Sequence, residues 1–103
     1  MVNMKVIWQP LAMQDLRDIY DYYVDDASLK FAKELKKKIL DSSKYLSKHP
    51  EMGKIEENLK LPKKDYLYFL VEENYKVLYI VSETEINILG VFDTRQSPNK
   101  MKG

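Results

Sequence analysis

The sequence predicts an α+β domain in which a helical hairpin packs on one face of a small antiparallel sheet, in the order β-α-α-β-β-β. Residues 10–48 contain two successive stretches whose apolar residues recur every three or four positions, which is typical of amphipathic helices. Residues 66–92 contain alternating apolar stretches separated by short polar turns, which is typical of antiparallel strands. With 103 residues, the chain is expected to form a single domain, residues 1–103, with one modest core.

The first strand is expected over residues 4–8. Pro10 then suits the first turn of a helix, because the N–H that it lacks would have no partner there. The apolar stripe of this first helix continues to Val24. Ser28 is expected to cap the second helix, which ends before Pro50 because a residue that precedes proline disfavours the helical conformation.

Three further strands are expected over residues 66–72, 75–81 and 86–92. Glu73 and Asn74 are expected to form a two-residue hairpin turn, because Asn tolerates a positive φ. Both faces of the last two strands are largely apolar, so these strands are expected at the centre of the sheet. Simple alternation would place four residues of the last strand on one face: Ile86, Ile88, Gly90 and Phe92.

Composition excludes several classes of function. The chain has no cysteine, which excludes disulfides and thiolate chemistry, and its net charge of +1 predicts no strong general affinity for nucleic acid. No apolar run is long enough to span a membrane and no signal segment opens the chain, so we expect a cytoplasmic protein. Residues 10–26 carry five aspartates, whereas residues 28–48 carry seven lysines, so we expect the two helices to form complementary flanks.

The sequence contains no nucleotide-binding loop, no zinc-ligand spacing and no serine–histidine–acid set, and no metal or cofactor is expected. The single histidine, His49, has a suitable ordinary pKa for a general base, but its place beside a proline favours a solvent-facing end of the second helix. The eight tyrosines could stack on bases, yet most fall on apolar faces and favour core packing.

The candidate functional residues follow the last strand, at Asp93-Thr94-Arg95-Gln96. Four cations are candidates for contact with phosphate or with a protein target: Lys63, Lys64, Lys76 and Arg95. In an antiparallel meander Arg95 and Lys76 belong to the opposite end of the sheet from the other two lysines, so the four cations are not expected to form one cluster.

Four segments resemble the RelE/ParE toxin superfamily, and they occur in the order typical of that superfamily. Residues 10–23 resemble its first helix, residues 49–53 its Pro-x-x-Gly turn, residues 74–79 its third strand and residues 86–95 its last strand. The resemblance implies a growth-inhibiting toxin of a type II toxin–antitoxin pair, of the plasmid stabilisation kind, held inactive by a cognate antitoxin. That antitoxin is expected to cover the helix pair or to add to a sheet edge. For the oligomeric state, both a homodimer and a toxin–antitoxin hetero-oligomer are alternatives.

The superfamily divides by target. RelE-like members resemble endoribonucleases that cut ribosome-bound mRNA without a metal. Such cleavage requires a base, cations that stabilise the phosphorane, and an acid. ParE-like members poison gyrase. The stretch Lys63–Tyr66 replaces the arginine common at the start of the second strand of the ribonucleases, and no histidine or tyrosine follows the last strand.

These departures favour a ParE-like gyrase poison over an endoribonuclease, and catalysis is left open. If the protein is a nuclease, Arg95 and Lys64 are the candidates for phosphate contact, and Glu72 or Asp93 is the candidate base. A domain of the same fold that binds a partner without toxicity is the third alternative.

Overall fold

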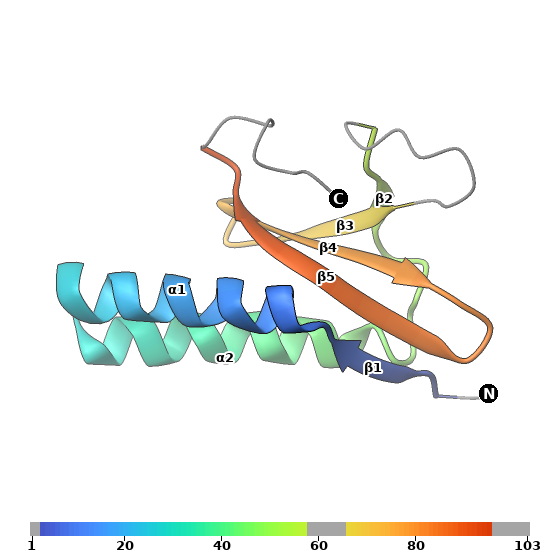
Figure 1. The fold of residues 1–103 in the computed structure, drawn as a ribbon, viewed down its shortest axis with the longest axis horizontal. Helices are drawn as coiled ribbons and strands as arrows, with labels where there is room; N and C mark the ends of the chain where they lie inside the picture. The colour runs from blue at the N-terminus through green and yellow to red at the C-terminus, as the bar shows by residue number, and fades with distance from the viewer. Residues whose placement is uncertain (1–2, 58–65, 96–103) are drawn as a thin grey trace.

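In the described part of the computed structural model, residues 3–57 and 66–95, two antiparallel helices cover one face of a five-stranded sheet (Figure 1). The strands lie in the order β1-β5-β4-β3-β2. In chain order the elements are β1 (Lys5–Trp8), α1 (Pro10–Asp26), α2 (Leu29–Tyr45), β2 (Lys54–Ile55), β3 (Leu67–Val71), β4 (Tyr75–Val81) and β5 (Glu85–Asp93).

The predicted α+β class, the helical hairpin and the four predicted strands are confirmed, with two differences in the sheet. The first is β2, an additional strand of two residues that pairs antiparallel with β3. Two residues are too few to show an alternating pattern, so the sequence carries no signal for it. The second is β1, which runs parallel to β5, with Lys5 opposite Glu85 and Trp8 opposite Ile88. The sheet is therefore mixed rather than wholly antiparallel.

The central position predicted for the last two long strands is confirmed, because β4 pairs with both β3 and β5, and β5 pairs with β1. The core lies between the sheet and the helices. The buried residues that form it are Ala12, Leu16, Leu35, Ile39, Leu46, Phe69, Val71, Tyr75, Val77, Tyr79, Ile86, Ile88 and Val91. Burial of this apolar surface is the main favourable contribution to folding.

A β-bulge at Leu89 corrects the alternation predicted for β5. Tyr79 is opposite Ile88 and Leu78 is opposite Gly90, so Leu89 is an extra residue without a partner on β4. The extra residue moves the alternation by one position. Val91 therefore belongs to the core, and Phe92, which was predicted to share a face with Ile88, does not.

The cap of α2 is confirmed, and the turn between β3 and β4 is not the predicted one. The hydroxyl of Ser28 accepts a hydrogen bond of 3.0 Å from the backbone N–H of Phe31. Because Val71 pairs with Tyr75, the turn contains three residues rather than two. The residues with positive φ in it are Glu72 and Glu73, at 53° and 62°, and not Asn74.

The turn between α2 and β2 is organised by Tyr79, whose ring is fully buried. Its hydroxyl donates a hydrogen bond of 2.9 Å to the carbonyl oxygen of Pro50 and accepts one of 2.9 Å from the N–H of Gly53. A Cβ atom on residue 53 would meet the Tyr79 hydroxyl and would lie 2.7 Å from the carbonyl oxygen of Tyr68. The Pro-x-x-Gly turn therefore needs glycine for steric reasons.

The predicted electrostatic match between the helices within one chain is wrong. Among residues 3–57 and 66–95 no ion pair joins α1 to α2: Lys37 pairs with Asp41 within α2, and Lys38 pairs with Glu72 in the β3–β4 turn. The helices meet through their apolar stripes, and the lysines of α2 and the aspartates of α1 other than Asp15 are exposed. In the described part of the chain, neither helix has the length and apolar character needed to cross a membrane.

Candidate functional site

A hollow of about 520 Å³ lies between α1 and the end of β5. It contains the predicted Asp93 and Arg95 together with residues of α1 and β4 that come from distant parts of the sequence. Its polar and aromatic lining consists of Asp15, Asp18, Tyr22, Tyr23, Tyr75, Phe92, Asp93 and Arg95. The hollow therefore combines three carboxylates, one guanidinium and three phenol rings.

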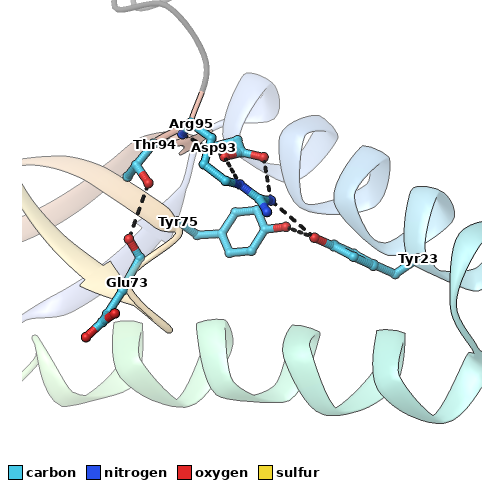
Figure 2. A network of polar contacts seen from close by, with 6 residues as sticks. All are labelled: Tyr23, Glu73, Tyr75, Asp93, Thr94 and Arg95. Atoms are coloured by element: carbon cyan, nitrogen blue, oxygen red, sulfur yellow. Dashed lines mark hydrogen bonds and ion pairs between the residues drawn. The ribbon is translucent and has the colours of Figure 1, made fainter.

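Figure 2 shows how the side chain of Arg95 lies between Asp93 and Tyr23. Its Nε and Nη2 atoms each donate a hydrogen bond of 2.9 Å, one to each carboxylate oxygen of Asp93, and the backbone N–H of Arg95 donates to the same carboxylate at 2.8 Å. Nη2 also lies 3.5 Å from the hydroxyl of Tyr23, which shares a short hydrogen bond with the hydroxyl of Tyr75. The charge of Arg95 is therefore neutralised by a bidentate contact with the carboxylate of Asp93, at the end of β5.

The pKa shifts of Asp93, Arg95 and Tyr75 hold these three groups in one protonation state near neutral pH. The hydrogen bonds from Arg95 lower the pKa of Asp93, and the same bonds raise the pKa of the Arg95 guanidinium. Burial, and then the hydrogen bond with Tyr23, raises the pKa of the Tyr75 phenol. Asp93 is therefore a weak base and Tyr75 a weak acid, so this arrangement favours binding and orientation over proton transfer.

Asp15 fastens α1 to β5 at the inner wall of the hollow. Its carboxylate accepts a hydrogen bond of 2.9 Å from the N–H of Val91, two residues after the bulge. Burial raises the pKa of Asp15, the bond from Val91 acts in the opposite direction, and the nearby charge of Asp18 raises it further. Sequence reasoning missed this residue, although a carboxylate one turn before the apolar Ile19 was an available signal.

The other predicted contact residues do not meet at the hollow. Lys76 follows Tyr75 on β4, so its side chain lies on the opposite face of the sheet, where it pairs with the buried carboxylate of Glu56 and lies 4.4 Å from the centre of the Tyr68 ring. The Lys76 side chain is only 17% exposed. Glu72, a candidate base, pairs instead with Lys38.

Lys63, Lys64 and Gln96 lie outside the described residues. His49 follows α2, is exposed as expected, and stacks its ring on Tyr45 with the ring centres 4.2 Å apart. Within residues 3–57 and 66–95 no group of three or more His, Cys, Asp or Glu residues is placed to hold a metal ion.

Two solved structures share this fold. A solved structure described as "Chromosomal ParDE TA system from P. aeruginosa" superposes with a TM-score of 0.72 at 24% identity, covering 87% of this chain and 95% of that chain. Another, described as "The structure of YoeB dimer from Staphylococcus aureus", gives a TM-score of 0.56 at 21% identity, covering 85% of this chain and 93% of that chain. These two likenesses show the fold.

The sequence defines the family. The family described as "ParE toxin of type II toxin-antitoxin system, parDE" matches residues 6–98, and the chain therefore belongs to the ParE toxin family of type II toxin–antitoxin systems. No curated protein sequence matches this chain significantly. The predicted superfamily and the predicted role as a toxin are confirmed, and a cognate antitoxin is the partner that the family implies.

Proposed function

We propose that this ParE toxin acts by binding DNA gyrase and poisoning it, and not by cutting mRNA. The observation that carries the proposal is the closed contact between Arg95 and Asp93. A ribonuclease needs a cation free to stabilise the phosphorane and a base that titrates near neutral pH. Here the guanidinium is already paired, and the pKa of its carboxylate partner is lowered.

The Tyr23–Tyr75 pair supports the same reading. The two hydroxyls bond to each other, and burial raises the pKa of Tyr75, so this phenol is held neutral and oriented. Arg95 remains 58% exposed at the rim of the hollow. A fixed aromatic and charged rim of this kind suits recognition of a protein surface, at which Tyr and Arg are enriched.

The proposal is tested with purified toxin and purified gyrase in a supercoiling assay. The expected result is loss of supercoiling with accumulation of cleaved DNA, and a weaker effect for Arg95→Ala because this variant removes a rim side chain. A matched control is Lys54→Ala, an exposed cation on β2. Full supercoiling at saturating toxin, together with transcripts cut in the ribosomal A site in arrested cells, would show that the protein is a RelE-like ribonuclease instead.

We further propose that the cognate antitoxin neutralises the toxin by covering the helix pair or by adding a strand to a sheet edge. The edge strand β2 supports the second mode, since it is two residues long and Ile55 is 58% exposed. Protection of β2 amides from hydrogen exchange in the complex would support the edge mode. Protection confined to α1 and α2 would support the other.

A further inference from the structure

Aromatic rings form much of the wall of the hollow between α1 and the end of β5. Four of its described lining residues carry a ring: Tyr22, Tyr23, Tyr75 and Phe92. The ring of Tyr23 is nearly perpendicular to that of Tyr22, at 85°, and to that of Tyr75, at 81°, with ring centres 5.0 and 6.4 Å apart. The face of an aromatic ring carries negative charge density, so a wall of this kind attracts a cation.

The charged groups of the same wall also favour a cation. The described lining contains three carboxylates and one guanidinium, so its formal charge is negative. The guanidinium of Arg95 is already bound to the carboxylate of Asp93 by two hydrogen bonds (Figure 2). The excess negative charge therefore lies on Asp15 and Asp18, about one turn apart on α1. An anion such as phosphate would be repelled from this part of the hollow.

Each of these two carboxylates has one oxygen engaged and one oxygen free for a ligand. Oδ2 of Asp15 accepts the hydrogen bond from the N–H of Val91, and Oδ1 of Asp18 accepts one of 2.8 Å from the side-chain amide of Gln14. Among the described residues no donor bonds to the second oxygen of either carboxylate. Asp15 is half-buried and Asp18 is exposed, so the pair extends from the inner wall of the hollow to solvent.

The donor set suits an organic cation better than a metal ion. Within residues 3–57 and 66–95 the acids of the hollow do not form a group of three placed to hold a metal, whereas hard metal ions require several oxygen ligands. An alkylammonium or guanidinium group needs fewer carboxylates, and its hydrocarbon stem packs on apolar surface. Ile19 and Val91 provide such surface within the hollow.

The dimensions of the hollow suit a ligand of side-chain size. Its volume of about 520 Å³ is within the range of roughly 300–1,000 Å³ that is typical of small-ligand sites. Its rim is open to solvent, because Tyr22 is 59% exposed and the side chain of Arg95 is 58% exposed. A ligand can therefore enter with its charged head first and leave the other end of its stem outside.

We propose that the hollow is a binding site for an aliphatic cation, that is, an alkylammonium or guanidinium group on a hydrocarbon stem. The charged head contacts the free oxygens of Asp15 and Asp18 and the face of a tyrosine ring. The stem lies along Ile19 and Val91. Two sources present this chemistry: a Lys or Arg side chain of a bound protein, and a free diamine. The site does not depend on whether gyrase is the target.

The experiment is an NMR titration of the isotope-labelled full chain with probes that share one ammonium chemistry. The first probe is Nα-acetyl-lysine N-methylamide, the second is the diamine cadaverine, and the neutral control is the norleucine counterpart of the first. The amide signal of Val91 should shift most, because its N–H is bonded to Asp15. The dissociation constant for the tighter amine should be on the order of 1 mM. Tighter binding of the lysine derivative assigns the site to a protein side chain, and tighter binding of cadaverine assigns it to a free diamine.

A pair of charge variants tests the role of the carboxylates. Asp18→Asn keeps an acceptor for Gln14 and removes one negative charge, so the dissociation constant should rise about fivefold or more. The matched control is Asp21→Asn, which makes the same change on α1 in a residue that lines a separate groove with Lys36 of α2. Its dissociation constant should stay within about twofold of the wild-type value, because the lost charge is outside the hollow.

A second pair of variants tests the role of the rings. Tyr22→Leu removes an exposed ring and keeps an apolar side chain, so binding should weaken about threefold through loss of the cation–π contact. Tyr22→Phe keeps the ring and should leave the affinity unchanged. The spectrum of each variant without ligand shows whether it is folded, and the Tyr22 pair tests the site even if Asp18→Asn fails to fold.

Three outcomes would overturn the proposal. The first is no shift of the Val91 signal with either amine up to about 20 mM, roughly twentyfold the expected dissociation constant. The second is an equal shift with the norleucine derivative or with inorganic phosphate, because the ammonium charge would then not be what the hollow recognises. The third is equal weakening by Asp18→Asn and Asp21→Asn, which general charge attraction would explain. The titration contains no gyrase, so its result is independent of the supercoiling assay.

Discussion

Removing the hydroxyl of Tyr79 is expected to destabilise the protein without disturbing its core. Tyr79→Phe keeps the buried ring and deletes two hydrogen bonds of 2.9 Å, one to Pro50 and one from Gly53. Each bond contributes about 1 kcal/mol net, and the half-buried N–H and carbonyl lose their partner, so the free energy of unfolding should fall by about 2 kcal/mol. For a domain of this size that corresponds to roughly 10 °C in Tm, and to about 1–2 M in the urea midpoint with an unchanged slope.

The matched control is Tyr45→Phe, because the Tyr45 ring is 55% exposed and the contact described for it is the stacking of its ring on His49. Its free energy of unfolding should change by less than about 0.5 kcal/mol. Gly53→Ala adds a second check, since its Cβ meets the Tyr79 hydroxyl. In the double variant Gly53→Ala with Tyr79→Phe, the clash with the hydroxyl is gone. The losses in free energy of unfolding of the two single variants should therefore sum to more than the loss measured for the double variant. Unchanged stability of Tyr79→Phe, or strict additivity with Gly53→Ala, would refute this account of the turn.

Three further substitutions have outcomes set by the contacts described. Burial raises the folded pKa of Asp15 above 3.8, so the contribution of Asp15 to stability falls as pH rises from 3.8 through that folded pKa. Asp15→Asn retains an acceptor for the N–H of Val91 and should remove this fall. In urea titrations at pH 7, the free energy of unfolding of this variant should be higher by up to about 1 kcal/mol. Arg95 lowers the folded pKa of Asp93, so the stability from this pair is present above the unfolded pKa of Asp93 and is lost as pH falls through its folded pKa. Asp93→Asn should abolish this loss of stability at low pH. The effect should be below about 1 kcal/mol because Arg95 is exposed. Ser28→Ala should lower the free energy of unfolding by about 1 kcal/mol, because it removes the cap of α2. A loss of helical circular dichroism signal without any change in the unfolding midpoint would contradict that assignment.

The elements that could be predicted are those set by local pattern. The two amphipathic stripes, the cap at Ser28 and the apolar alternation of β3 and β4 each depend on residues within a few positions of one another. The elements that could not be predicted depend on partners far along the chain. β2 exists because Lys54 meets Tyr68, and the β3–β4 turn has three residues because Val71 pairs with Tyr75.

The candidate site divides in the same way. The end of β5 was identified because the apolar pattern stops there, and Asp93 and Arg95 do lie together. Tyr23 joins them across 72 positions and was assigned only to the core, because a tyrosine on an apolar stripe gives no sign of where its hydroxyl will lie. Conversely, Lys76 looked available in sequence, and only the fold shows it held against Glu56 on the other face.

The extra residue at Leu89 has a consequence for how this chain tolerates changes in length. Every other residue of β5 from Ile86 to Asp93 has a fixed partner on β4, so adding or deleting a residue elsewhere would force the remaining pairs out of register. At Leu89 one residue could be removed, and the partners on both sides would stay as they are. Alignment gaps between relatives within this strand should therefore collect at Leu89, and a one-residue deletion engineered there should preserve the strand end that carries Arg95.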